Sequence, residues 1–382
     1  MKKIRTRLIF SVLLIVTMLM MSAAPTFATY YQEVDSQDSN DGLVTSSVIS
    51  QATTWLYDNY GEFYDIQNVN ADIVRIFEND DVIRYTVRVS CETMLKCNSV
   101  YELPFVKGLY STLASKSAQS NEKTAIDTFI SEIDADFEEY HGLTVPVVIA
   151  IDKNDDTAPR TMYYQNSVLT TLYDIDVLAL DSQEMYDAGR SAASDIVSEY
   201  TASIGRGYSL YNRTAARDYA LKWSSNPSTC YDHGNSCTAT PAIKSDRSKW
   251  NNTVYPYFST FMHNDCANFI SQAMSAGGLP EDGTNGTTWF RVKNVSTQSW
   301  GTPWTSVSSL KSWMTNSSRK YWDSSTYAAC NAGNIVLITS SHVAMVTLND
   351  TINHLYTAHT TDVKDQPLTN NSSYLYYTIK TT

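Results

Sequence analysis

The sequence predicts an α+β protein with two domains, and three observations lead to this prediction. Helical patterns and β-favouring runs occur together in the first half of the 382-residue chain. About 350 residues remain after removal of an N-terminal signal, and this length is typical of two domains. The stretch Ile204-Gly205-Arg206-Gly207 interrupts a helical pattern, and from Tyr208 onward Trp, Ser, Thr and Asn become more frequent while charged residues become fewer. We therefore place an N-terminal α+β domain of unknown role at residues 43–200 and a second domain at residues 208–382.

The first 28 residues have the composition of a secretory signal. Four basic residues precede the apolar run Leu8–Met21, which is shorter than a bilayer-spanning helix, and small residues follow. We expect cleavage after Ala28, with Ala24 as the second choice, and an uncleaved membrane anchor is the alternative. Residues 29–42 are expected to form a flexible segment. No later segment is apolar enough to span a membrane, so the sequence predicts a secreted protein, extracellular or associated with the cell wall.

The charge balance narrows the choice of partners. The chain contains 28 Lys and Arg residues and 40 Asp and Glu residues. Four of the basic residues and none of the acidic ones lie in the signal, so the mature chain has 24 basic against 40 acidic residues, a net charge of −16. This balance argues against nucleic acid as a partner. It leaves the oligomeric state open.

Hydrophobic periodicity predicts the elements of the N-terminal domain. Apolar residues at helical spacing predict helices at Leu43–Tyr60, Glu122–Tyr140 and Met185–Tyr200. β-Favouring runs predict strands at Asp72–Phe77, Val82–Cys91, Leu143–Ile151 and within Met162–Leu180. Residues 78–81 have the composition of a turn between the first two strands. None of these segments has a catalytic signature.

The second domain is predicted to contain three helices and an antiparallel sheet. The helices begin after Asn212, at Cys266 and after Thr305 or Ser306, and the second of them stops at Gly277-Gly278. The predicted strands are Asn334–Ile338, His342–Leu348 and Asn353–His359, of which the first two pair as antiparallel neighbours.

Cys266 is the candidate nucleophile. Asp265 is placed to cap the helix with its carboxylate, and the apolar stripe on which Cys266 lies continues through Phe269, Ile270, Ala273 and Met274. A thiol at the open end of this stripe meets the positive field of the helix N-terminus, which lowers the thiol pKa. The alternative is a cysteine that serves as a small core residue.

His342 is the candidate general base, because it starts a strand downstream of Cys266. It shares a sheet face with Ala344 and Val346, and an unpaired imidazole is tolerated there only at the edge of a cleft. The next strand ends at His359, which can lie beside His342 and fix the tautomer of its ring. Other candidates for this third position are Thr357, Thr360 and Asp362.

Six cysteines in an exported chain raise the question of disulfides. Two pairs are close enough in sequence to close small loops, Cys91 with Cys97 and Cys230 with Cys237. Cys266 and Cys330 then either pair with each other or leave Cys266 free, and we favour the free thiol because its neighbours suit catalysis. No Cys-x-x-Cys pair or helical His-x-x-x-His pair suggests a metal, and no cofactor is expected.

Two tryptophans are candidates for a ligand surface. Trp289 and Trp300 lie in a Gly- and Asn-rich loop, where they can contact a sugar or a peptide. Leu310 and Trp313 follow helical spacing and are expected in the core.

Taken in order, these features resemble the putative amidase domain family, within the papain-like superfamily that includes the NlpC and CHAP cell-wall peptidases. The resemblance covers about residues 208–380 and rests on Tyr211-Asn212-Arg213, Ala215-Ala216, Tyr219-Ala220, Asp265-Cys266, Asn268-Phe269, Ser271-Gln272, Gly277-Gly278, Trp304-Thr305 and His342-Val343-Ala344. It implies a papain-like α+β fold in which Cys266 is the nucleophile, His342 the base and His359 the third residue. Relatives usually have Gly-Asp where this chain has Gly333-Asn334, a difference that concerns a structural contact more than catalysis.

We therefore expect a secreted cysteine amidohydrolase that cuts amide bonds, with peptidoglycan peptides as the substrate by analogy. In this hypothesis the Cys266 thiolate attacks the carbonyl carbon and the Cys266 backbone N–H holds the oxyanion. His342 protonates the leaving amine and then activates water, while His359 holds its ring. Two alternatives remain open, a catalytically inactive cell-wall binding or adhesive protein and a papain-like acyltransferase.

Overall fold

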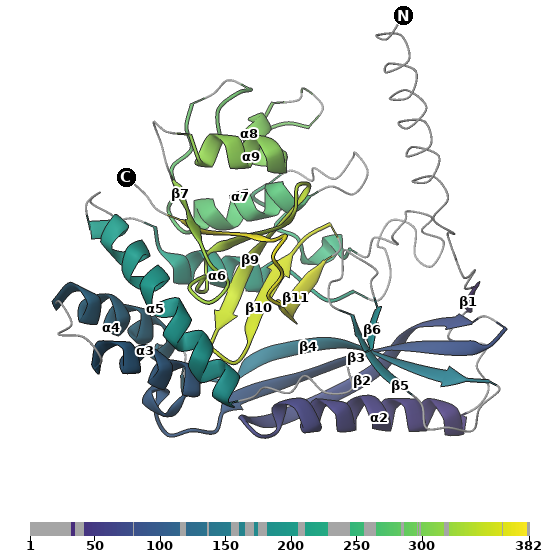
Figure 1. Ribbon diagram of the computed structural model, residues 1–382. Helices are drawn as coiled ribbons and strands as arrows, with labels where there is room; N and C mark the ends of the chain where they lie inside the picture. The colour runs from purple at the N-terminus through teal and green to yellow at the C-terminus, as the bar shows by residue number, and fades with distance from the viewer. Residues whose placement is uncertain are drawn as a thin grey trace, which may run out of the picture.

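The computed structural model describes residues 32–34, 42–78, 80–114, 120–135, 137–153, 160–164, 172–174, 182–204, 211–227, 245–255, 265–283, 286–295, 297, 299–316, 321–360 and 362–379. The predicted secretory signal and most of segment 29–42 lie outside the described residues. The described elements confirm an α+β protein with two six-stranded antiparallel sheets, one from each half of the chain. Figure 1 shows the two sheets as separate layers.

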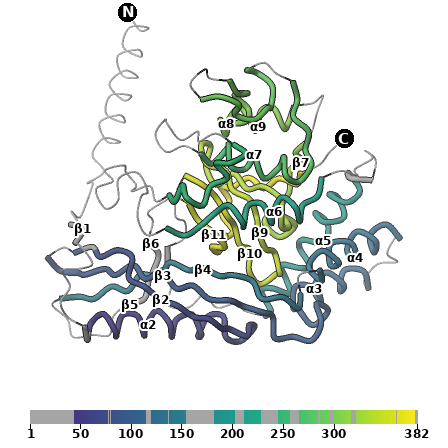
Figure 2. The backbone as a smooth tube through the Cα atoms, turned by 180° about the vertical axis from the view of Figure 1, so that it is seen from behind, coloured from purple at the N-terminus to yellow at the C-terminus, as the bar shows by residue number. Residues whose placement is uncertain are grey.

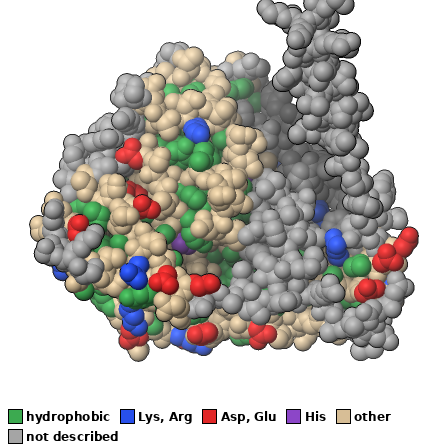
Figure 3. Space-filling model, viewed as in Figure 1, with side chains coloured by type: hydrophobic (Ala, Val, Ile, Leu, Met, Phe, Trp, Pro, Cys, Tyr) green, Lys and Arg blue, Asp and Glu red, His purple; other side chains and the backbone are tan. Residues whose placement is uncertain are grey.

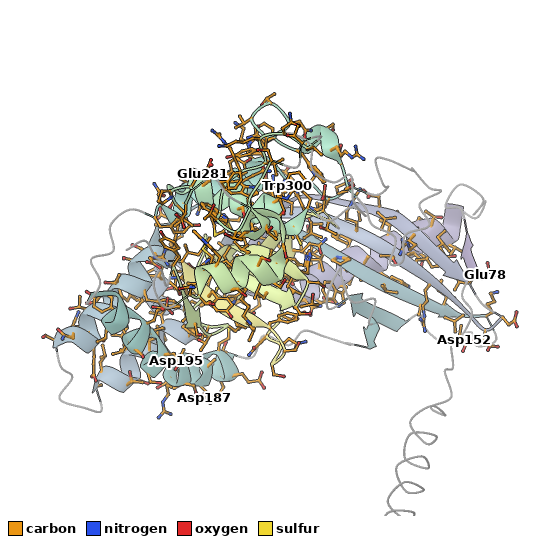
Figure 4. The ribbon with its side chains drawn as sticks, turned by 90° about the horizontal axis from the view of Figure 1, so that it is seen from above. Glu78, Asp152, Asp187, Asp195, Glu281 and Trp300 are labelled. Carbon is orange, nitrogen blue, oxygen red and sulfur yellow. The ribbon has the colours of Figure 1, made fainter. Side chains whose placement is uncertain are left out.

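The N-terminal half is built on long antiparallel strands. Its sheet has the order β1 (Gln32–Val34), β2 (Tyr64–Glu78), β3 (Val82–Leu95), β4 (His141–Asp152), β5 (Arg160–Tyr164) and β6 (Leu172–Asp174). Helix α2 (Gly42–Tyr60) runs along one face of this sheet, and α3 (Pro104–Ala114), α4 (Ser120–Asp134) and α5 (Ser182–Ile204) gather at one end of it (Figure 1). In Figure 4, Glu78 and Asp152 lie at the far end of these strands, away from the C-terminal half.

Three predicted helices of this half are confirmed, and α3 was missed. Gly108 lies in the middle of α3 and weakens the helical signal of that segment. Tertiary packing requires this glycine, because a Cβ there would lie 2.1 Å from the carbonyl oxygen of Tyr186 on α5. Strand β2 also begins earlier than predicted, at Tyr64. Its register shifts between Gln67 and Asn70, and this bulge interrupts the alternation on which the prediction depended.

Four of the described α-helices of the C-terminal half pack around a second sheet. The helices are α6 (Arg213–Lys222), α7 (Cys266–Ala276), α8 (Thr302–Thr305) and α9 (Val307–Met314). The sheet has the order β11 (Val363–Pro367), β10 (His354–Ala358), β9 (His342–Asn349), β8 (Ile335–Thr339), β12 (Leu375–Ile379) and β7 (Trp322–Ser325). The predicted antiparallel pairing of β8 with β9 is confirmed. Figures 1 and 2 both show this sheet between the layer of α7, α8 and α9 and the N-terminal half.

Strand β9 has a different core on each of its faces. Val343 and Met345 belong to the cluster that packs around α6, α7 and α9. Ala344 and Val346 belong to the cluster on the opposite face. Because side chains alternate along a strand, these two pairs of residues point to opposite faces of the sheet.

The two halves share a core at the end of the second sheet that lies away from His342. The turn between β9 and β10 contributes Ile352 to the same buried cluster as Trp55 of α2. The hydroxyl of Tyr64 donates to Oδ2 of Asp350 at 2.7 Å in a buried contact across this junction. The other end of β9, where His342 lies, is therefore away from this shared core.

Charge is distributed unevenly between the halves. On the face in Figure 3, many charged side chains lie over the N-terminal elements, whereas uncharged side chains and backbone cover most of the C-terminal half. This agrees with the change of composition near residue 208. Within the described part of the chain, no helix combines the length and the apolar character that a membrane span needs.

Candidate active site

Helix α7 presents Cys266 at its first position, as the sequence predicts. The helix ends at Ala276 with Gly277 as its C-cap. A Cβ on Gly277 would lie 2.5 Å from the ring of Tyr211, so the close approach of the chain before α6 requires glycine there. Residues 266–274 are all buried, so α7 is buried on every side instead of along one stripe. A helix in this position must find partners for its polar side chains inside the protein.

Asp265 supplies one of these partners, although not in the way predicted. It is the N-cap residue, but its carboxylate caps none of the described backbone N–H groups of α7. Instead Oδ1 accepts from Nδ2 of Asn268 at 2.8 Å, and Oδ2 accepts from Nδ1 of His359 at 2.8 Å. The predicted side-chain cap is therefore wrong, because the carboxylate is used to pair with a buried histidine.

The other polar residues of α7 extend this network to two tryptophans. Nε1 of Trp304 donates to Oδ1 of Asn268 at 2.7 Å, and Nε1 of Trp289 donates to the hydroxyl of Ser271 at 3.0 Å. The same hydroxyl donates to the carbonyl of Trp304 at 3.0 Å. Trp289 is 0% exposed, so its prediction as a ligand surface is wrong. Its loop folds back onto α7, which the local sequence does not reveal.

His359 is held on all sides. Its Nε2 lies 2.7 Å from the carbonyl oxygen of Trp223, and its ring stacks between Phe269 at 3.7 Å and Trp250 at 4.6 Å between centroids. A carboxylate and a carbonyl are both acceptors, so this arrangement favours the protonated ring, in which both nitrogens donate. Burial alone lowers the pKa of His359, but Asp362, Asp265 and the Trp223 carbonyl together raise it.

The thiol of Cys266 lies at the start of β9. Sγ is 3.6 Å from the carbonyl oxygen of Ser341, the residue directly before His342. Burial raises the pKa of this thiol, and the Val343 amide and the Thr360 hydroxyl only partly oppose this. The pKa of the Cys266 thiol is therefore shifted in the direction opposite to the predicted one, because burial disfavours the thiolate.

Two backbone N–H groups at the start of α7 donate to the same side-chain oxygen. The N–H groups of Asp265 and Cys266 both donate to Oγ1 of Thr360, at 3.0 Å and 3.1 Å. Thr360 has φ of 94°, a left-handed backbone conformation that is strained for a β-branched residue. Two convergent N–H groups are the arrangement that a developing oxyanion needs.

His342 is buried with an unused ring nitrogen. Among the hydrogen bonds of the described residues, none involves its Nε2. Burial lowers the pKa of His342 to about 4, so the imidazole is uncharged at neutral pH. An orphan polar atom in the interior costs free energy and calls for an explanation, and a catalytic role is one.

The candidates for the third position have partners elsewhere, but Oδ1 of Asp362 has none among the described residues. Both ring nitrogens of His359 are used by Asp265 and Trp223, so neither is left to orient His342 in this arrangement. Oδ2 of Asp362 accepts from Nε1 of Trp250 and from the Asp246 amide, both at 2.9 Å. Thr357 Oγ1 accepts from the Asp365 amide at 3.3 Å. Cys266 thus lies against the start of the strand that begins at His342, whereas His359 is paired with Asp265.

The described cysteines are free thiols, namely Cys91, Cys97, Cys266 and Cys330. The Cys91–Cys97 bridge that the spacing allowed is therefore not formed, and Cys266 does not pair with Cys330. The other predicted pair, Cys230 with Cys237, lies outside the described residues. Within the described part of the chain, no group of three His, Cys, Asp or Glu side chains is placed to hold a metal ion.

Two further residues singled out in the sequence are Trp300 and Asn334. Trp300 lies with Glu281 in the connection between α7 and α8 (Figure 4), half-buried against the α7 core. Asn334 is buried and accepts from the Ile379 amide at 3.1 Å, while its Nδ2 has no partner among the described residues. A carboxylate at this position would accept from the same amide of β12.

A cavity of about 360 Å³ lies where the two halves meet, between α4 and the start of α6. Glu132, Arg213 and Asp350 are among its lining residues. Glu132 pairs with Arg213 across this junction. Cys266, His342 and His359 do not line the cavity. We therefore assign it no part in the candidate active site.

Residues 210–381 match the family model described as a putative amidase domain. No curated protein matches the chain, and no solved structure does. The matched range contains α6, α7, the whole second sheet and all three predicted catalytic positions. The match thus indicates that the C-terminal half of this chain is related to enzymes that hydrolyse amide bonds.

Proposed function

We propose that this protein is a secreted cysteine amidohydrolase with a papain-like catalytic domain that cleaves amide bonds in peptidoglycan peptides. One observation carries the proposal. The Cys266 thiol at the start of α7 lies against the backbone at the start of β9, and the first residue of that strand, His342, has a buried ring nitrogen without a partner. A helix with the cysteine, packed on an antiparallel sheet with the histidine, supports the papain-like comparison.

The two groups begin the reaction uncharged. Burial raises the pKa of Cys266 and lowers that of His342, so both the thiol and the imidazole are neutral before the reaction. In the proposed first step, Nε2 of His342 takes the thiol proton while sulfur bonds to the carbonyl carbon. The electron pair of the C=O double bond moves to oxygen, which becomes the oxyanion.

The oxyanion takes the position of the Thr360 hydroxyl. The N–H groups of Asp265 and Cys266 already converge on one oxygen there. Collapse of the intermediate breaks the C–N bond, and the His342 imidazolium gives its proton to the leaving amine. Water then attacks the thioester with His342 as base, which releases the carboxylic acid and restores the thiol.

His359 supports the nucleophile in this proposal. As an imidazolium it holds the Asp265 carboxylate, and Asp265 directly precedes Cys266. Its role is thus to fix the first turn of α7, and no contact with the ring of His342 is needed. The choice of peptidoglycan and of an extracellular location comes from the family comparison and from the predicted signal, by analogy.

The test is to incubate the full mature protein with purified peptidoglycan and to identify the released fragments by mass. We expect Cys266→Ala to lose activity by at least about a thousandfold, as expected when a nucleophile is removed. Cys330→Ala is the matched control, because Cys330 is also a buried free thiol but packs on the opposite face of the sheet. New amino termini would identify a peptidase, and transfer to an added amine would identify an acyltransferase. Full activity of Cys266→Ala would refute the proposal.

The burial of Cys266 also favours a second candidate, an inactive cell-wall binding protein. Cys266 is only 5% exposed, and an inert core cysteine would look the same. Alkylation of the native protein with iodoacetamide separates the two. A catalytic thiol should react faster than Cys330, by peptide mapping, and peptidoglycan should protect it. Equal inertness of both thiols would favour the binding protein.

A further inference from the structure

The short segment Trp223–Asn226, which follows α6, lies between the two sheets of the protein. It touches the edge strand β11 of the second sheet on one side and strands β3 and β4 of the first sheet on the other. β11 and β4 are also in direct contact with each other. The segment therefore links the half of unknown role to the half that contains the candidate active site.

Asn226 pairs with β11 as an additional strand residue would. Its Oδ1 accepts from the Lys364 amide at 2.8 Å, and its Nδ2 donates to the Lys364 carbonyl at 2.8 Å. One side-chain amide thus satisfies both backbone groups of an edge-strand residue, which would otherwise need water or another chain. This contact fixes the segment to the second sheet.

The N-terminal sheet holds the same residue from the other side. Nδ2 of Asn226 also donates to Oγ1 of Thr144 on β4 at 3.0 Å. The guanidinium of Arg88 on β3 donates to the Asn226 carbonyl and pairs with Asp72 on β2. The first sheet therefore contacts both the side chain and the backbone of Asn226.

Trp223, at the other end of the segment, contacts the candidate active site. Its carbonyl accepts from Nε2 of His359, and Nδ1 of the same ring donates to Asp265, the residue before Cys266. We propose that the N-terminal sheet is part of the active-site scaffold, and that Asn226 is a positioning residue through which it holds the Trp223 carbonyl against His359.

The test uses the full chain with ¹⁵N-labelled histidine and follows the ring nitrogens of His359 by NMR as the pH is raised. His359 is assigned by elimination against His→Gln variants of the other five histidines. The charged groups that face its ring are Asp265 from α7 and Asp362 after β10. Neither carboxylate is changed in the variants below, so a shift in the pKa of His359 reports on its contact with the Trp223 carbonyl.

We expect Asn226→Ala to lower the pKa of His359 by about one unit, because a hydrogen bond to a charged group is worth roughly one to two units. Asn294→Ala, in the connection between α7 and α8, is the matched control and should leave it unchanged. Thr144→Val removes a contact from the N-terminal side alone and should shift the pKa in the same direction. The double variant Asn226→Ala with Thr144→Val should add little, because both act through one contact.

Thr86→Val is the control for Thr144→Val. Thr86 lies on β3 of the same sheet, and its buried hydroxyl has no partner among the described residues. If Asn226→Ala folds, with an unchanged circular dichroism spectrum, and the pKa of His359 stays within about 0.2 units of the wild type, the proposal is overturned. If Asn226→Ala does not fold, an unchanged His359 in Thr144→Val overturns it in the same way.

The importance of this positioning for catalysis rests on the proposed hydrolase function, but the NMR measurement does not. A shifted His359 in a protein that hydrolyses nothing would support the scaffold role and refute the proposed function. An unchanged pKa of His359 in a variant of an active enzyme would refute the scaffold role and leave the proposed function supported. In an active enzyme, Asn226→Ala should lower kcat by about tenfold with KM little changed, because it disturbs the nucleophile helix and leaves substrate contacts in place.

Discussion

The buried pair between Asp265 and His359 can be tested directly with Asp265→Asn. Both side chains are 2% exposed, and they are joined at 2.8 Å. The substitution keeps the shape of the side chain and removes its charge. Since a hydrogen bond between charged groups is worth about 1.5–3 kcal/mol and a buried charge without its partner costs more, we expect a loss of about 3 kcal/mol in the free energy of unfolding.

The pH dependence of this loss follows from the sign of the histidine shift. The folded-state pKa of His359 is raised, so its contribution to stability is fully present below the unfolded value of about 6.5 and disappears as the pH rises through the folded value. Without the carboxylate, this contribution is much smaller. The difference between wild type and Asp265→Asn is therefore largest below about pH 6.5 and becomes smaller as the pH rises.

Urea unfolding at several pH values measures this difference. Asp246→Asn is the matched control, because Asp246 also precedes a helix but caps the Ser248 amide with its side chain near the surface. Asn caps about as well as Asp, so the control should lose less than about 0.5 kcal/mol. If Asp265→Asn were as stable as Asp246→Asn at pH 6, the pair would contribute nothing and our account of the site would be wrong.

Three further outcomes are expected. His342→Gln should gain stability relative to the wild type as the pH falls from about 6.5 to about 4, because burial lowers the pKa of His342 to about 4 and the unfolded wild type takes up this proton first. Urea unfolding at both pH values measures the difference, and an unchanged difference would contradict this account. Trp289→Ala should lower the free energy of unfolding by about 3–5 kcal/mol, because Trp289 is a core residue. Thermal unfolding measures this loss, and a loss below about 1 kcal/mol would contradict the prediction. Gly333→Ala should lower the free energy of unfolding by about 1–3 kcal/mol, since Gly333 has φ of 81° and an added Cβ would lie 2.5 Å from the Arg213 carbonyl oxygen. Gly286→Ala is the control, because Gly286 has open space around it, and this variant should have the melting temperature of the wild type.

Local signals in the sequence predicted the main elements around the site. Asn212 caps α6 by accepting from the Ala215 amide at 2.9 Å, α7 starts at Cys266, and Gly277 ends it. The pairing of β8 with β9 was predicted from alternation and a short connection. These features depend on residues a few positions apart, so their physical cause is present in the sequence itself.

The sequence by itself therefore determined which residues start and end the elements of the site, and it placed Cys266, His342 and His359 at the ends of one helix and two strands. Only the tertiary structure decided what these residues touch and in which charge state they are. Asp265 meets His359, which is 94 residues away, and Thr360 reaches the Cys266 amide from a similar separation. Burial then reverses the local expectation for the Cys266 thiol by raising its pKa, and it lowers the pKa of the His342 ring. Desolvation depends on everything that packs around a group, and no short stretch of sequence contains that information.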